Sequence, residues 1–114
     1  MSLESAEDLC IALTTARTPA EARKLAGLLV ERRLATCVNM LPGACSLYRW
    51  KNTIEEATET ILIIKTSRHL AEEVHGLLRS AHSYELPEFV VLPLASGGAE
   101  YLDWLRQGMD VAAD

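Results

Sequence analysis

The stretch Cys37-Val38-Asn39-Met40-Leu41-Pro42-Gly43-Ala44-Cys45-Ser46-Leu47-Tyr48-Arg49-Trp50 decides how this chain folds. It has the composition of one long β-strand that is interrupted by Pro42-Gly43. Because proline has no N–H to donate to a β-ladder and glycine tolerates unusual backbone angles, this pair predicts a bend or a bulge. A strand of this length exceeds the sheet of a small domain. We therefore expect its far end to pair with something else, such as a second copy of the chain.

The rest of the chain alternates strand and helix signals around that long strand. Three further apolar runs predict strands at residues 9–13, 59–65 and 89–94. One helix is expected to begin at the capping box Thr18-Pro19-Ala20-Glu21, a second to be capped by Thr66 or Ser67, and a short third to end at Gly108. The order β-α-β-β-α-β with a short C-terminal helix predicts a ferredoxin-like α+β fold with an antiparallel sheet.

Size and composition predict one globular domain over residues 1–114, with frayed tails at 1–7 and 109–114. The chain has 114 residues, of which 49% are hydrophobic, so a packed core is expected. Its net charge of −5 and the lack of a basic stripe argue against nucleic-acid binding. No apolar run approaches the roughly 20 residues of a membrane span.

The cysteines and the N-terminus indicate the compartment. The first eight residues are acidic and lack the basic segment of a secretory signal. Three cysteines cannot all pair within one chain. Reduced thiols in the cytoplasm are therefore the expected state.

The expected strands around 9–13, 59–65 and 89–94 are apolar continuously and not alternately. A sheet with helices on one face and water on the other should alternate apolar and polar residues. Two helices can cover only one face, so the other face must meet protein. The pattern predicts an oligomer, because a monomer with this exposed face would risk aggregation.

The chain resembles the CutA family, which is named for divalent-cation tolerance. The resemblance lies in five segments, at residues 35–44, 46–50, 64–66, 84–88 and 101–105. It implies a compact homotrimer of ferredoxin-like subunits, similar in plan to the PII signalling proteins. It also implies a cytoplasmic role in divalent-metal tolerance that depends on binding, of copper or another divalent cation, and not on catalysis.

The resemblance also implies a metal site at Cys37 and His82. A thiolate and an imidazole suit copper or zinc. Some family members carry further ligands at positions that here are Thr14, Leu77 and Ala81, so two protein ligands would need completion by another subunit. The alternative is that Cys37 packs as a small hydrophobic residue.

A second set of residues is expected, by the same resemblance, to line a cleft between subunits: Trp50, Glu59, Lys65, Tyr84 and Glu88. One interpretation is that these residues form ion pairs and hydrogen bonds that fix the register of the trimer. The other is a pocket for a small anion, with Lys65 as the point charge. This second interpretation makes the protein a PII-like sensor of an anionic metabolite.

Other functions that use this fold lack their residues here. Acylphosphatase-like enzymes need a phosphate-binding loop after the first strand, but residues 14–18 hold one arginine and no glycine. RNA-recognition domains need exposed aromatic residues on central strands, and the segments 9–13 and 59–65 have none. A cysteine hydrolase would need Cys37 beside a base. The sequence favours a protein that is not an enzyme.

Overall fold

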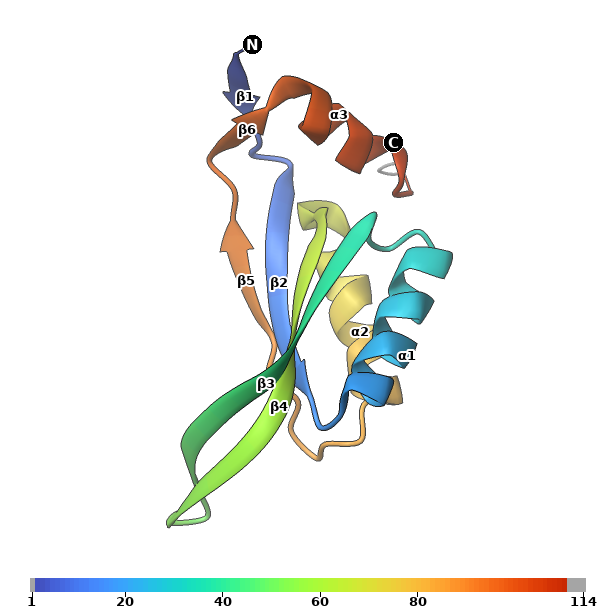
Figure 1. Cartoon of the computed structure of the whole chain (residues 1–114). Helices are drawn as coiled ribbons and strands as arrows, with labels where there is room; N and C mark the ends of the chain where they lie inside the picture. The colour runs from blue at the N-terminus through green and yellow to red at the C-terminus, as the bar shows by residue number, and fades with distance from the viewer. Residues whose placement is uncertain (1, 111–114) are drawn as a thin grey trace.

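The computed structural model describes residues 2–110 and contains a four-stranded antiparallel sheet with strand order β3-β4-β2-β5 (Figure 1). Its elements are β2 (Leu9–Ala16), α1 (Pro19–Glu31), β3 (Cys37–Trp50), β4 (Thr53–Ser67), the 3₁₀ turn η1 (Arg68–Leu70), α2 (Ala71–Ala81) and β5 (Val90–Pro93). A two-stranded sheet of β1 (Leu3–Ser5) and β6 (Ser96–Gly98) precedes α3 (Ala99–Gln107). The predicted ferredoxin-like order with a C-terminal helix is confirmed.

The start of α1 follows its capping signal with one difference. The Thr18 hydroxyl accepts a hydrogen bond from the Glu21 N–H at 3.1 Å, and Pro19 takes the first helical position. The Glu21 carboxylate accepts from the N–H of Arg17 at 3.0 Å instead of from that of Thr18. Its other oxygen accepts from the N–H of Ser83 at 2.8 Å. Glu21 therefore ties the start of α1 to the segment that leaves α2.

Both main helices pack on the same face of the sheet (Figure 1). Leu25 of α1 and Val74 of α2 are fully buried. They belong to one core cluster with Ala12, Leu62 and Ile64, which are the residues of β2 and β4 that face the helices. Burial of these apolar side chains supplies the main driving force for folding.

The long strand pairs within its own chain, so the prediction that its far end needs another partner is wrong. β3 and β4 form one hairpin in which Cys37 lies opposite Lys65 and Trp50 opposite Thr53. The register shifts between Leu41 and Ala44 at the predicted bulge, where Gly43 has φ +82°. The sequence alone could not show that β4 would also extend and match the length of β3.

We call residues 44–59 the hairpin arm, because this part of β3 and β4 extends past the end of β2. Figure 1 shows the arm leaving the sheet on the side away from α3. The last residue of β2 lies opposite Thr60. The turn of the arm is made by Lys51 and Asn52, with φ values of 50° and 67°. From Thr53 to Glu59, β4 therefore pairs with β3 and with no other strand among residues 2–110.

The second face of the sheet carries apolar side chains that α1 and α2 leave uncovered. Ile11 and Leu13 of β2 lie opposite Lys65 and Ile63 of β4. Because side chains alternate along a strand, these residues occupy the face away from α1 and α2. Ile11, Leu13 and Ile63 are half-buried and do not belong to the core cluster. We call the side chains of Ile11, Leu13, Leu41, Ile61, Ile63, Val90 and Leu92 the open sheet face.

The ends of the described chain are more ordered than expected. Residues 1–7 were predicted to be frayed, but Leu3–Ser5 pairs with β6 and Ala6 is fully buried. Met109 was assigned to the other tail, yet it is buried in the core. Arg106 of α3 holds Asp8 with two parallel hydrogen bonds of 2.9 and 3.0 Å, which fastens the two ends together. Residues 111–114 of the predicted tail lie outside the described residues.

Within residues 2–110, no helix has the length and apolar character needed to cross a membrane.

Candidate functional site

A groove with a volume of about 1140 Å³ lies between the hairpin arm and the segment that joins α2 to β5. The arm contributes Tyr48, Trp50 and Glu59, and the joining segment contributes Tyr84 and Glu88. Four of the five residues predicted for the inter-subunit cleft therefore line one groove within a single chain. Lys65 is the exception.

Glu59 and Tyr84 form the central contact of this groove. Glu59 is only 8% exposed, which makes it the most buried charged side chain of the groove. The Tyr84 hydroxyl donates a hydrogen bond of 2.6 Å to the Glu59 carboxylate. Such a short bond to an ionised acceptor is stronger than a bond between neutral groups. The contact fixes the joining segment against the arm.

The surroundings of Glu59 keep its carboxylate ionised. Burial works to raise the pKa of Glu59, but the 2.6 Å hydrogen bond from the Tyr84 hydroxyl and the neighbouring hydroxyls of Ser46 and Thr15 outweigh it, so the pKa lies below its ordinary value. Burial and the Glu59 carboxylate together raise the pKa of Tyr84 far above that of a free tyrosine. Tyr84 is therefore a hydrogen-bond donor and not a base at neutral pH.

Arg17 borders the groove at the end of β2 and stands over the Tyr84 ring, with 5.1 Å between the guanidinium carbon and the ring centroid. That distance is within the range of a cation–π contact. Neither Arg17 nor Tyr48 is among the residues that were predicted to line the cleft. Tyr48 could have been found, because it shares a face with Trp50 on the long strand. Arg17 had no such signal.

His82 lies directly behind the groove with its side chain fully buried. Its Nε2 contacts the Thr15 carbonyl oxygen at 2.5 Å, and its Nδ1 contacts the Tyr84 N–H at 3.0 Å. A carbonyl can only accept and an N–H can only donate, so Nε2 carries the proton and Nδ1 does not. Both nitrogens of a neutral ring are thus occupied. His82 holds the joining segment in place and has no free lone pair to offer a metal.

The two predicted metal ligands do not meet within one chain. Cys37 lies opposite Lys65, whereas His82 bonds to Thr15, which lies opposite Ile61. These two points on β4 are four residues apart, about 13 Å at the rise of a β-strand. Within residues 2–110, no group of three or more His, Cys, Asp and Glu side chains is arranged to hold a metal ion. The residues of a single chain do not fit a metal site.

Lys65 belongs to a different cluster from the groove. Its ammonium donates a hydrogen bond of 3.0 Å to the Tyr101 hydroxyl of α3. This hydrogen bond and the nearby Cys37 raise the pKa of Lys65, although partial burial opposes them. Within its own subunit, Lys65 therefore cannot act as the point charge for an anion bound beside Glu59 and Tyr84.

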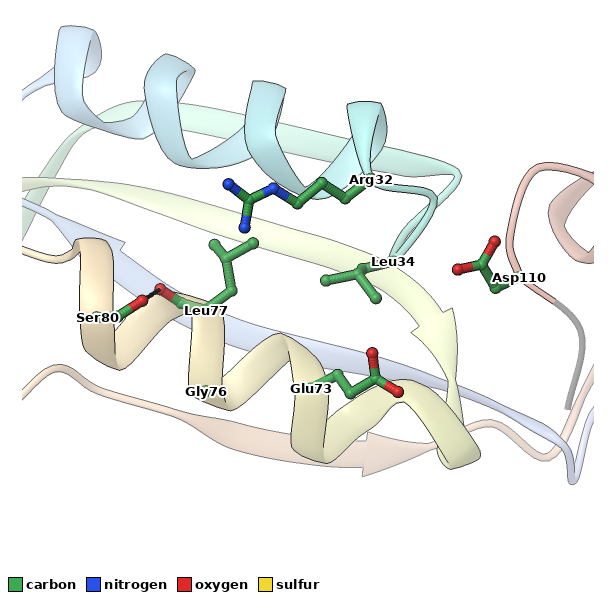
Figure 2. Close-up of a pocket in the computed structure, with 7 residues that line it drawn as sticks. All are labelled: Arg32, Leu34, Glu73, Gly76, Leu77, Ser80 and Asp110. Atoms are coloured by element: carbon green, nitrogen blue, oxygen red, sulfur yellow. Dashed lines mark hydrogen bonds between the residues drawn. The ribbon is translucent and has the colours of Figure 1, made fainter. Parts of the chain in front are cut away.

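A second, smaller cavity of about 430 Å³ lies between α1 and α2. Figure 2 shows Leu34 and Leu77 between Arg32 on one side and Glu73 on the other. Its one hydrogen bond between lining residues joins the Ser80 hydroxyl to the Leu77 carbonyl within α2, at 2.9 Å. No buried charge faces this cavity. The groove at the hairpin arm is the better candidate site.

Comparisons with known proteins agree on one family. A family model described as CutA1 divalent ion tolerance protein matches residues 10–108. The divalent-cation tolerance protein CutA of Thermus thermophilus is 43% identical over 97 residues, which are 85% of this chain and 94% of that protein. Human protein CutA is 41% identical over 93 residues, but these are 82% of this chain and only 52% of the human protein.

A solved structure is similar in fold as well as in sequence. The structure of CutA from Synechococcus elongatus complexed with a Bis-Tris molecule is 39% identical, with a TM-score of 0.88. The match covers 95% of this chain and all of that one.

Proposed function

The chain belongs to the CutA1 divalent ion tolerance family, and from this premise we propose that it acts in divalent-metal tolerance as a homotrimer that binds ligands and does not catalyse a reaction. One observation supports the assembly above the others. The open sheet face presents seven apolar side chains that α1 and α2 leave uncovered. Three identical subunits that pack these faces together around an axis would remove them from water at about 25 cal/mol per Å².

Light scattering on the purified chain tests the assembly. We expect a mass about three times the 12.6 kDa of one chain. Ile63→Asp should break the assembly, because it places a charge where the subunits meet. Val30→Asp is the matched control, since Val30 is 44% exposed on α1, which packs on the other face of the sheet. A wild type of one-chain mass at micromolar concentration would contradict the proposal.

Metal binding through Cys37 and His82 would require ligands from more than one subunit, and we expect it to be weak. Calorimetry with zinc should give a small signal that Cys37→Ser removes. Cys45→Ser is the control, because Cys45 is an exposed thiol on the hairpin arm. Tight binding that survives Cys37→Ser combined with His82→Ala would show that other residues hold the metal.

The proposed compartment is the cytoplasm. Cys10, Cys37 and Cys45 are all free thiols. An exposed free thiol persists most readily in a reducing compartment. Labelling of Cys45 in intact cells by a membrane-permeant maleimide, but not by an impermeant one, would support this location.

A second candidate function is that of a small-molecule sensor, as in the PII-like alternative. The observation that favours it is the groove, whose volume is ample for a small ligand. A similar CutA structure is described as a complex with a Bis-Tris molecule, which is a hydroxylated amine. The anionic form of this candidate relied on Lys65, which lies outside the groove. The charge of a ligand in the groove therefore depends on the residues that do line it.

A further inference from the structure

We propose that the groove at the hairpin arm takes a small organic cation of the ammonium class, held by the Glu59 carboxylate and the surrounding aromatic rings. This inference rests on the second candidate function, but it assigns the ligand a positive charge instead of a negative one. Three features of the described residues carry it: a buried carboxylate without a counter-charge, a concentration of aromatic rings, and an excess of unpaired acids.

The first feature is the charge of Glu59. Only 8% of Glu59 is exposed, and burial by itself would raise its pKa, yet hydrogen bonding, above all from the Tyr84 hydroxyl at 2.6 Å, lowers that pKa. Buried charges in proteins are normally paired with an opposite charge. Among residues 2–110, Glu59 takes part in no ion pair. His82 stands close by, but its Nε2 donates to a carbonyl and its Nδ1 accepts from an N–H. This is the hydrogen-bonding pattern of a neutral ring, which supplies no positive charge. A cation from outside the chain would supply the missing charge.

The second feature is the distribution of aromatic rings. The chain has six phenylalanine, tyrosine and tryptophan residues, and four of them line this groove. They are Tyr48, Trp50, Tyr84 and Phe89. The faces of such rings attract cations and are the usual partners of ammonium ligands. A groove built for a phosphate or a carboxylate would gain little from them.

The third feature is the balance of charges around the groove, in which the acids outnumber two cations that stand over its rings. Arg17 stands 5.1 Å from the Tyr84 ring, and Lys51 stands 5.6 Å from the Trp50 ring. Both cations are exposed side chains that can move away. Three carboxylates line the same groove, those of Glu59, Glu85 and Glu88, and none of the three forms an ion pair among residues 2–110. The acids outnumber the cations, so an added positive charge is favoured.

The missing cation has a second possible source, which is a lysine or arginine from another copy of the chain. We favour the free ligand because four aromatic rings, which attract ammonium groups, line the groove. The two sources differ in what Glu59 does. With a free ligand, Glu59 governs ligand affinity. With a partner side chain, it governs the stability of the assembly.

Calorimetry on the full chain tests the proposal, with choline and ethanolamine as cations and with acetate and phosphate as anions. We expect the cations to bind and the anions not to bind. Glu59→Gln keeps the shape of the side chain and should weaken cation binding about tenfold or more, since a charge-assisted contact is lost. Trp50→Leu should do the same while leaving Glu59 intact, which covers the case that Glu59→Gln folds poorly.

The matched control is Glu72→Gln, which removes an equal charge from an exposed position on α2 outside the groove. It should leave cation binding unchanged. Light scattering on every variant separates ligand affinity from assembly. A monomeric wild type that still binds choline would refute the trimer and support the groove.

Three results would overturn the proposal. The first is a wild type that binds neither cation, and the second is one that binds the anions more tightly. The third is cation binding that survives both Glu59→Gln and Trp50→Leu. If wild type binds no cation and Glu59→Gln dissociates the assembly, the counter-charge comes from another subunit.

Discussion

The two halves of the β3–β4 hairpin share one ladder but differ in what surrounds them. In the sheet half, Leu62 and Ile64 are fully buried under α1 and α2. In the hairpin arm, Leu47 is 71% exposed and Ile54 is 62% exposed. In Figure 1, α1, α2 and α3 all lie away from the arm. The same strands therefore serve as core in one half and as surface in the other.

This difference indicates what each half contributes. The sheet half gains its stability from burial of apolar side chains between two layers. Among residues 2–110, the arm is held by its turn, its ladder, the contact between Glu59 and Tyr84 and contacts between its own exposed side chains, so most of its side chains remain available to a ligand or to another subunit. The candidate site lies where the two halves meet, because only there is a charged group both buried and open to a groove.

The largest difference in stability should appear when a leucine is replaced by alanine in each half of the hairpin. Leu62→Ala should lower the free energy of unfolding by about 2–5 kcal/mol, since it leaves a cavity in a core with little room to collapse. Leu47→Ala should change it by less than about 0.5 kcal/mol, because its side chain is already in water. Urea denaturation at one fixed protein concentration measures both. A large loss for Leu47→Ala would mean that the arm is buried against another subunit.

The next effect tests the contact that joins the arm to the segment after α2. Tyr84→Phe removes the donor of the 2.6 Å hydrogen bond to Glu59 and should cost about 1.5–3 kcal/mol of unfolding free energy. Tyr101→Phe deletes the same hydroxyl at an exposed position, where it receives a bond from Lys65. This control should lose much less. Equal losses for the two variants would show that the hydrogen bond to Glu59 stabilises the fold no more than an exposed one.

The pH dependence of the unfolding free energy should test the role of Glu59 in the same contact. Its pKa in the folded state lies below the ordinary value of 4.5, so the ionised carboxylate stabilises the fold. That contribution should be complete above pH 4.5 and should be lost as the pH falls through the lowered folded pKa. Glu59→Gln cannot titrate, so the stability difference between wild type and this variant should shrink as the pH falls below 4.5. A difference that does not vary with pH would contradict the assignment.

The smallest effect concerns the bulge between the two halves. Gly43→Ala should cost about 1 kcal/mol, because an alanine must adopt the positive φ of this position although its Cβ would meet no atom within 4 Å. Gly27→Ala in α1 also has open space around its Cβ but lies inside a helix, so it should stabilise the protein by a few tenths to 1 kcal/mol. Thermal unfolding of the two variants should show shifts of opposite sign.

Much of this architecture could be predicted from the sequence, because local rules govern it. The capping box at Thr18 and the apolar spacing that follows it lead directly to α1. Pro42-Gly43 marked the bulge in β3, and the continuously apolar strands indicated a sheet with a second face to cover. The ends were missed, because the pairing of Leu3–Ser5 with β6 joins segments about ninety residues apart.

The sequence by itself determined the order of the main strands and helices, the position of the bend and the residue types available for a site. Only the tertiary structure decided which of them meet. It paired the hairpin arm with its own chain, gave both nitrogens of His82 to the backbone, and placed Lys65 with Tyr101 instead of with Glu59. Periodicity assigns a side chain to a face of a strand, but its neighbours depend on the register between strands. That register follows from how the whole core packs.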